Sequence, residues 1–301
     1  MAQTPEDTKA APGLLEPAFL RKLEQAAISS RHILRGRSKG ERRSSKKGSS
    51  VEFADFRSYS PGDDLRYLDW NAYARLQKLF LKLFLEEEDL HVYVLLDASA
   101  SMGFGTPEKF GWGLRAAGAL AYIALSSDDR VQLFCHHADD VTRSRMFRGR
   151  GSAPEAFEWL IPLRPEGGTD LVGACDAFLR SIPAPGVTFL ISDLLCPDWE
   201  ATLGRLAAAK GEVCVIQVLA PDEYTPDLQG DLRLVDSETE EAREITIGSS
   251  VLRRYERTRD EFIASVRGTC HRYGFSHLLS LSDDPVEDVV LRQLRRLQVI
   301  R

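Results

Sequence analysis

From Leu90 to its end, the chain alternates short apolar runs with segments of helical length, and this pattern limits the fold more than any other feature. The apolar runs predict strands at 90–96, 131–135, 187–192, 212–220 and 275–281. The segments between them predict helices, including those near 107–126, 198–209 and 251–273. We therefore expect an α/β fold with a doubly wound, mostly parallel sheet that carries helices on both faces.

Local patterns predict further elements within this region. Ser152 and Glu155 have the spacing of a capping box, which predicts the start of a helix. Short apolar runs at 232–236 and 243–247 flank an acidic turn, so we expect a hairpin inserted near 230–248.

The N-terminal part has a different character. Residues 1–13 are polar and rich in Ala and Pro, which predicts a disordered tail. Apolar spacing predicts an amphipathic helix over 14–34, and the run of Gly, Ser, Lys and Arg at 36–50 predicts a flexible basic loop. The pattern at 78–88 fits either a strand or a helix, and we favour a strand that pairs with 90–96. We thus expect a small α+β extension over 14–88, followed by one domain over 89–301.

Charge and cysteine content limit the function classes. The formal net charge is −6, although residues 31–50 hold eight Lys and Arg against one Glu, so this window contributes +7 and the rest of the chain −13. The whole molecule is therefore not a general nucleic-acid binder. The basic window could contact an acidic protein, nucleic acid or anionic lipid; we favour a solvated linker, because no aromatic residues are interleaved for base stacking.

The sequence also bears on location. Its five cysteines form no C-x-x-C pair, which is typical of reduced, mostly buried thiols. No apolar run approaches the ~20 residues that a membrane helix needs. The amino terminus lacks a signal-peptide pattern. We expect a cytoplasmic protein without a membrane span.

Oxygen-bearing side chains mark the predicted ends of two strands. Asp97, Ser99 and Ser101 follow the first strand at spacing i, i+2, i+4, so in an extended segment they point to one side. Asp193 ends the strand at 187–192, and Thr169 lies in a Gly-Gly loop before a helix. Ligands of doubly wound sheets bind beyond the carboxyl ends of the strands. These five residues therefore predict a site for Mg²⁺ or Mn²⁺, whereas either aspartate alone would more often cap a loop.

Charged and aromatic residues also crowd the segment 51–75. Those that we single out as candidate partner-binding residues are Asp63, Asp64, Arg66, Asp69, Trp70 and Arg75. Two interpretations stay open, a docking surface for a partner or a salt-bridged structural knot. The segment has no His, Cys or nucleophile paired with a base, so we do not expect catalysis here.

Catalysis is not expected at the predicted metal site either. Phosphohydrolases of the D-x-D type use the second Asp as an acid, and Ser99 occupies that position here. The pair His136 and His137 has no identified partner, and we expect it at the surface. A phosphate-binding G-x-x-x-x-G-K-[ST] motif is also missing from the sequence. The alternatives that remain are a Mg²⁺-dependent phosphohydrolase-like enzyme and a basic-loop binder of nucleic acid or membrane surfaces.

Three short motifs resemble one known family, and a longer stretch before them resembles another. D-x-S-x-S at 97–101, Gly-Gly-Thr-Asp at 167–170 and Ser-Asp at 192–193 resemble the metal-ion-dependent adhesion site of von Willebrand factor type A domains, over roughly 88–300. The stretch 51–75, with Tyr-Ser-Pro-Gly-Asp-Asp-Leu-Arg-Tyr-Leu-Asp-Trp at 59–70, resembles the signature of the bacterial family called domain of unknown function 58.

The resemblance implies a function as well as a Rossmann-like fold. Hydroxyls of Ser99, Ser101 and Thr169 would coordinate the ion, Asp97 and Asp193 would act directly or through water, and an acidic side chain of a partner would take the open position. Members of the second family are typically encoded beside MoxR-type AAA+ ATPases. We thus expect a non-catalytic adaptor that works with such an ATPase on a client protein, in complex assembly or chaperone-like remodelling. Many members have membrane helices before the signature and this sequence has none, which again implies a cytosolic location.

Overall fold

The structure is a computed structural model that describes residues 13–30, 52–61, 63–85, 90–137, 140–209, 211–235 and 242–301. The chain forms two compact units: the larger combines 1–30 with 90–301, and the smaller spans 31–89. The expected basic loop at 36–50 lies outside the described residues, as does the expected tail apart from Gly13. The structure thus groups the first thirty residues with the larger unit, whereas the sequence analysis placed residues from 14 onward in the N-terminal extension.

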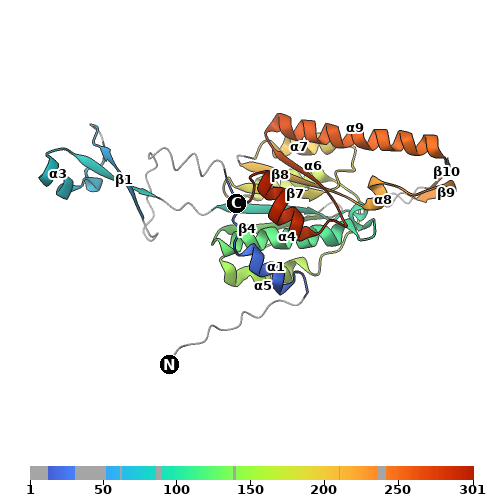
Figure 1. The fold of residues 1–301 in the computed structure, drawn as a ribbon, viewed down its shortest axis with the longest axis horizontal. Helices are drawn as coiled ribbons and strands as arrows, with labels where there is room; N and C mark the ends of the chain where they lie inside the picture. Colours follow the sequence, from blue (N-terminus) through green and yellow to red (C-terminus); the bar gives the residue numbers. More distant parts are fainter. Residues whose placement is uncertain are drawn as a thin grey trace, which may run out of the picture. The chain divides into compact units, whose positions relative to one another are not determined.

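A central sheet organises the larger unit, with strand order β11-β8-β7-β3-β4-β5 and with β6 also paired to β4 (Figure 1). Its strands are β3 His91–Asp97, β4 Arg130–His137, β5 Asp140–Arg143, β6 Phe147–Arg148, β7 Val187–Ser192, β8 Glu212–Leu219 and β11 Ser276–Leu281. Neighbouring strands from β11 to β4 run parallel, and β5 and β6 run antiparallel to β4. The predicted α/β class with a mostly parallel sheet is confirmed.

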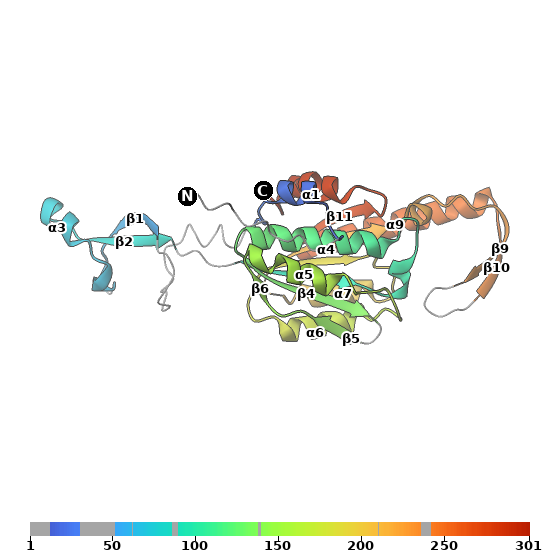
Figure 2. The ribbon, with the colours of Figure 1, turned by 90° about the horizontal axis from the view of Figure 1, so that it is seen from below.

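Helices lie on both sides of this sheet (Figures 1 and 2). One side carries α1 Pro17–Leu23, α4 Lys109–Ser126, α5 Ala153–Leu160 and the C-terminal segment made of α10 Val286–Asp288, a π-helical turn Val289–Gln293 and α11 Leu294–Arg296. The other side carries α6 Leu171–Ser181, α7 Trp199–Leu206 and α9 Ser249–Tyr273. Between β8 and α9 lie the short helix α8 Pro221–Tyr224 and an antiparallel hairpin of β9 Gly230–Val235 and β10 Ala242–Ile247.

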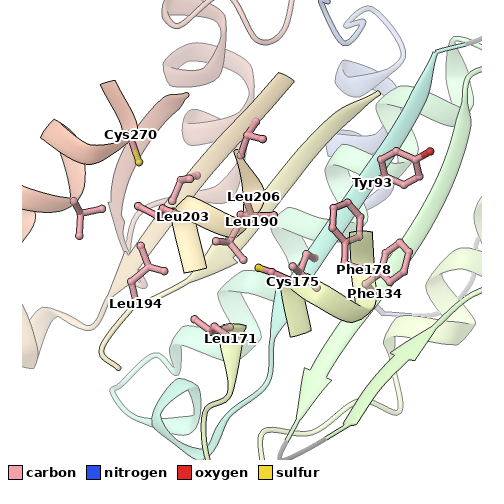
Figure 3. Packing of buried hydrophobic residues seen from close by; sticks show 14 residues of the cluster. Tyr93, Phe134, Leu171, Cys175, Phe178, Leu190, Leu194, Leu203, Leu206 and Cys270 are labelled. Atoms are coloured by element: carbon pink, nitrogen blue, oxygen red, sulfur yellow. The ribbon is translucent and has the colours of Figure 1, made fainter. Parts of the chain in front are cut away.

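The cores on the two sides of the sheet explain why the strands are apolar throughout. Beneath α6 and α7, the rings of Tyr93, Phe134 and Phe178 pack edge to face, with the Phe134 and Phe178 centroids 5.0 Å apart (Figure 3). On the opposite side, Gly113 allows α4 to approach β3, because a Cβ atom there would lie 3.0 Å from the Leu96 side chain. Strands covered on both faces bury nearly every side chain.

The strand order reverses at β3, the first strand of the sheet in the chain. The next strand, β4, lies on one side of β3, whereas β7 lies on the other. Loops that leave β3 and β7 therefore diverge at one edge of the sheet, and this is the position at which open α/β sheets bind ligands.

Two expected elements of the N-terminal region differ in the structure. Within the described residues 14–30, the expected helix is limited to α1, because Ile28 pairs with Ile300 in an antiparallel bridge; residues 31–34 lie outside the described part. The strand expected to pair with 90–96 is β2 Phe80–Leu85, and it pairs instead with β1 Glu52–Ser58. The apolar pattern at 78–88 indicated a strand, but a local pattern does not specify which strand it pairs with.

The expected capping box is also wrong. Ser152 caps α5 without a side-chain hydrogen bond, because its hydroxyl donates to the carbonyl of Arg148 at 2.8 Å. Glu155 forms an ion pair with Arg145 instead of turning back to the helix start.

The smaller unit contains a two-stranded antiparallel sheet of β1 and β2. The connection between these strands includes the 3₁₀ turn η1 Leu65–Tyr67 and the helix α3 Trp70–Leu76. Leu68 bridges Leu81, and the amide of Asp69 donates to the Phe80 carbonyl at 2.9 Å. These bonds attach the turn and α3 to β2.

The state of the cysteines and the length and polarity of the helices relate to the expectations of reduced thiols and of no membrane span. All five cysteines are free thiols, and four of them are buried. Burial raises the pKa of each thiol to about 12, so the thiolate is disfavoured. Across the described part of the chain, no helix combines the length and the apolar character needed to cross a membrane.

Replacing Leu203 with Ala should lower the free energy of unfolding of the larger unit by about 2–5 kcal/mol, because it leaves a cavity in the core under α7. Urea denaturation followed by tryptophan fluorescence measures this loss. Leu228→Ala is the matched control, since Leu228 is exposed, and it should cost less than about 1 kcal/mol. Equal losses in the two variants would contradict the position of the core.

Candidate metal-ion site

Asp97 ends β3 inside the protein, with its side chain fully buried. Its Oδ1 accepts a hydrogen bond from the amide of Ser99 at 2.9 Å, and its Oδ2 accepts one from the hydroxyl of Ser192 at 2.6 Å. Because Ser192 is the last residue of β7, this contact joins the ends of the two strands at the point where the strand order reverses.

The two serines of the loop after β3 lie side by side. Their hydroxyl oxygens, Oγ of Ser99 and Oγ of Ser101, are 3.0 Å apart. Ser99 has an extended backbone and precedes the 3₁₀ turn η2 Ala100–Gly103. The two hydroxyls meet as expected, but not through the extended backbone that the sequence analysis assumed, because Ser101 lies inside the 3₁₀ turn.

Asp193 follows β7 and is almost completely buried. Its Oδ1 accepts a hydrogen bond from the Leu195 amide at 3.0 Å, and its backbone carbonyl accepts one from the Gln217 side chain at 3.3 Å. The negative charge of Asp193 contributes to raising the pKa of Asp97, so the two carboxylates interact electrostatically.

The Gly-Gly loop that carries Thr169 lies along the loop after β3. Ala100 donates its amide hydrogen to the Gly167 carbonyl at 2.9 Å, and Glu166 donates to the Ala98 carbonyl at 2.8 Å. Thr169 is half-buried between these contacts and the start of α6. The three predicted segments therefore meet at one edge of the sheet.

His136 is buried, so its expected place at the surface is wrong. Its Nε2 accepts the amide hydrogen of Asp170 at 3.0 Å, and its backbone carbonyl accepts that of Ala98 at 2.7 Å. His136 lies in β4, beside β3 near the centre of the sheet, where the loops of the site cover it. This histidine thereby helps to hold the loop that contains Thr169.

Sequence reasoning missed two charged residues of the site. Lys109 begins α4 and is fully buried, and its Nζ donates to Asp193 Oδ2 and to Glu223 Oε1, each at 2.6 Å. Glu223 lies in α8, directly after β8. The rule that ligands gather after strand ends could have indicated Glu223, whereas nothing in the pattern distinguishes Lys109 from an exposed lysine at a helix start.

Burial and charge shift the pKa values of these groups. Burial, followed by the charge of Asp193, raises the pKa of Asp97 to about 6, so this carboxyl is mostly ionised at neutral pH. Burial alone would lower the pKa of Lys109, but the charges of Asp193 and Glu223 together raise it. At Glu223, burial raises the pKa more than the nearby ammonium group lowers it.

The donor set fits a hard divalent cation. Asp97 is a buried carboxylate whose hydrogen bonds come from neutral groups, and a buried charge is costly unless a cation compensates it. The nearby hydroxyls of Ser99 and Ser101 supply further oxygens of the kind that Mg²⁺ accepts. Within the described ranges, no group of three or more His, Cys, Asp or Glu side chains could hold a metal. Hydroxyls would therefore have to complete the coordination.

The candidate partner-binding residues lie in the smaller unit and fall into two groups. Asp63 pairs with Arg57 at 2.9 Å, Asp64 caps η1, and the buried Asp69 caps α3 by accepting the amide hydrogens of Asn71 and Ala72. Arg66, Trp70 and Arg75 are exposed, and Arg66 also forms an ion pair with Asp64 at 2.6 Å.

Together, the fold and the site define an α/β protein with an oxygen-rich acidic cluster at the switch point of its sheet. The family described as "Protein of unknown function DUF58" matches residues 55–264, which is more than half of the chain. The chain belongs to this family. Uncharacterized proteins of Mycobacterium tuberculosis and Mycobacterium bovis are each 32% identical over 244 residues, which cover 79% of this chain and 76% of either relative.

Solved structures show more distant similarity. The conserved hypothetical protein BatB from Bacteroides thetaiotaomicron has 14% identity and a TM-score of 0.42, covering 69% of this chain and 98% of that chain. An aerotolerance-related membrane protein from Bacteroides fragilis has 14% identity and a TM-score of 0.44, covering 69% and 97%. These values are too low to assign a fold family or a function.

The buried Gln217 and the half-buried His277 form a hydrogen-bonded pair next to Asp193. The Gln217 amide that binds the Asp193 carbonyl also contacts Nε2 of His277 through its oxygen, at 3.2 Å. Burial, with a smaller contribution from the charge of Arg267, lowers the pKa of His277 to about 4. Since an unfolded histidine titrates near pH 6.5, the unfolded chain binds the extra proton between these values, and protonation favours unfolding there.

Replacing His277 with Gln should remove this pH dependence. The free energy of unfolding of the wild type, minus that of the variant, should rise by on the order of 1–3 kcal/mol from about pH 4 to about pH 7. Urea denaturation at several pH values measures the difference, with His271→Gln, at an exposed position of α9, as the matched control. A difference for His277→Gln that stays constant across this range would contradict the buried neutral imidazole.

Proposed function

We propose that the larger unit is a von Willebrand factor type A domain with a metal-ion-dependent adhesion site for Mg²⁺ or Mn²⁺. The residues that would hold the ion are Asp97, Ser99, Ser101, Thr169 and Asp193. The observation that carries this proposal is the buried Asp97 carboxylate, which lies at the switch point of the sheet and, within the described part of the chain, accepts hydrogen bonds from neutral donors alone.

The composition of the site supports recognition of an acidic group. When bound, the ion would supply a hard, positively charged centre for an incoming oxygen ligand. Asp97 and Asp193 provide the carboxylates of the set, and the hydroxyls of Ser99, Ser101 and Thr169 add oxygens without adding charge. Because the site is partly closed to water, attraction to a carboxylate of a partner protein would be stronger than at an open surface.

We propose a binding role and not a catalytic one. Ser99 stands at the position where D-x-D phosphohydrolases carry an acid, and a serine hydroxyl cannot act as that acid. The proposed role is that of an adaptor between a MoxR-type AAA+ ATPase and a client protein, in complex assembly or chaperone-like remodelling. This partner class is what the resemblance at 51–75 implies, since members of that family are typically encoded beside such ATPases. The cytoplasmic location stays a prediction.

The smaller unit offers a candidate surface for the ATPase. Trp70 and Leu76 expose 62% and 60% of their surface on α3, beside the exposed Arg75. Tryptophan and arginine are enriched among the residues that contribute most to protein interfaces. The aspartates Asp63, Asp64 and Asp69 shape this unit through their pairs and caps, and we assign the contact itself to Arg66, Trp70 and Arg75.

Chelator-treated protein should bind Mg²⁺ and Mn²⁺ saturably, and Asp97→Ala/Ser101→Ala should abolish this binding because it removes one carboxylate and one hydroxyl of the site. Isothermal titration measures the binding. In thermal melts, an ion at a hundred times its Kd should stabilise the wild type by about 2.7 kcal/mol.

A matched control pair lies in the hairpin, where the Thr246 hydroxyl donates to Asp231 at 2.5 Å. Asp231→Ala/Thr246→Ala removes the same kinds of group and should leave ion binding unchanged. If the wild type takes up neither ion, the proposed site is wrong.

Trp70→Ala/Arg75→Glu should weaken binding to a purified MoxR-type ATPase of the same bacterium by about 30-fold or more, because loss of a central interface residue costs about 2 kcal/mol or more. Biolayer interferometry with and without chelator measures the affinity. Tyr273→Ala, which removes an exposed aromatic residue of α9, is the control. Undiminished binding by the double variant would exclude α3 as the contact surface.

A further inference from the structure

Lys109 places an ammonium group at the position where a divalent ion would need access to Asp193. The side chain is fully buried, and its Nζ lies 2.6 Å from Oδ2 of Asp193. The other oxygen of this carboxylate accepts the amide hydrogen of Leu195. Both oxygens of Asp193 are therefore already engaged within the chain, whereas Asp97 has no cationic partner among the residues that the structure describes.

We infer that Lys109 is a built-in cation that competes with a divalent ion for Asp193, and that Glu223 holds Lys109 when the ion binds. This inference rests on the proposed metal site. A bound dication and the Lys109 ammonium group would repel each other across a buried, weakly screened environment. Binding therefore requires that Asp193 give up part of its contact with Lys109.

Glu223 is positioned to keep Lys109 paired during this exchange. Its Oε1 lies 2.6 Å from Nζ, and its Oε2 accepts the amide hydrogen of Ala220 at 2.7 Å, which fixes the orientation of the carboxylate. Lys109 thus has two carboxylate partners and can release one of them without becoming an unpaired buried charge.

The helix that carries Glu223 is itself held by α9. The Tyr255 hydroxyl donates to the Glu223 carbonyl at 2.6 Å, and the Arg259 guanidinium bonds the Tyr224 carbonyl and lies over the Tyr224 ring. These contacts attach α8 to α9 through the backbone of Glu223 and through the backbone and ring of Tyr224. Glu223 therefore keeps its place near Lys109 whether or not Asp193 participates.

Substitutions of Lys109 and of Glu223 should change the affinity for the ion in opposite directions. Lys109→Gln should strengthen Mg²⁺ and Mn²⁺ binding about tenfold or more, because it removes the competing charge and frees Asp193. Glu223→Gln should weaken binding about threefold or more, because Lys109 then depends on Asp193 alone. In the Lys109→Gln background the second substitution should lose most of its effect, since Glu223 acts through Lys109.

Isothermal titration of both ions into the two single variants and the double variant measures this cycle, and circular dichroism checks folding. Two controls remove similar charges elsewhere: Lys22→Gln breaks an exposed pair with Glu287, and Asp222→Asn neutralises the exposed neighbour of Glu223 on α8. Both controls should bind ions as the wild type does. The ion-induced rise in melting temperature should be largest for Lys109→Gln.

The outcomes separate this inference from the proposed function. Equal or weaker ion binding by folded Lys109→Gln, with binding intact in the wild type, would overturn the competition and leave the metal site standing. If neither the wild type nor Lys109→Gln binds an ion, the proposed metal site is wrong, and so is the inference that rests on it. Binding by Lys109→Gln alone, lost again with Asp97→Ala, would support both. Should Lys109→Gln not fold, Glu223→Gln decides, and unchanged affinity there would overturn the inference.

Discussion

The cost of burying charge is the constraint on which the site depends. Asp97, Asp193 and Glu223 are carboxylates withdrawn from water, and Lys109 is an ammonium group that Asp193 and Glu223 share, whereas Asp97 accepts a hydrogen bond from Ser192. A buried carboxylate is tolerated only where hydrogen bonds or a cation compensate it. Lys109 compensates Asp193 and Glu223, whereas the Ser99 amide and the Ser192 hydroxyl stabilise Asp97 without neutralising it. The acidic excess is thus concentrated at the end of β3.

The sheet supplies the rigidity that this arrangement needs. β3 is covered on both faces and hydrogen-bonded on both sides, so Asp97 at its end has little freedom to move away from Asp193. The reversal of strand order sends the loops after β3 and β7 in different directions, which is the arrangement at which open sheets bind ligands. Hydrogen bonds between Ala98 and Glu166 and between Ala100 and Gly167 then attach the Gly-Gly loop to the loop after β3. Local spacing and long-range topology therefore produce the cluster together.

Much of this architecture could be predicted from the sequence, because local patterns encode it. Apolar runs marked the parallel strands, and the close spacing of Ser99 and Ser101 indicated that their hydroxyls would lie together, although a 3₁₀ turn and not an extended backbone brings them there. The failures share a different cause, since each depends on a distant partner. The pairing of β2 with β1 and the burial of His136 follow from strand order, and Ser152 found a competing acceptor in Arg148. Lys109 and Glu223 are 114 positions apart, and periodicity carries no information about such pairs.

A site with its own internal cation separates folding from ion binding. If Asp97 and Asp193 both lacked compensation, their repulsion would oppose folding until an ion arrived. Lys109 removes most of this penalty in advance, because it neutralises Asp193 and remains held by Glu223. On this argument the larger unit folds without a metal, and ion binding changes only the local charge and the contacts of Asp193. A partner that recognises the ion would then be controlled by ion occupancy, while the fold that presents the site stays constant.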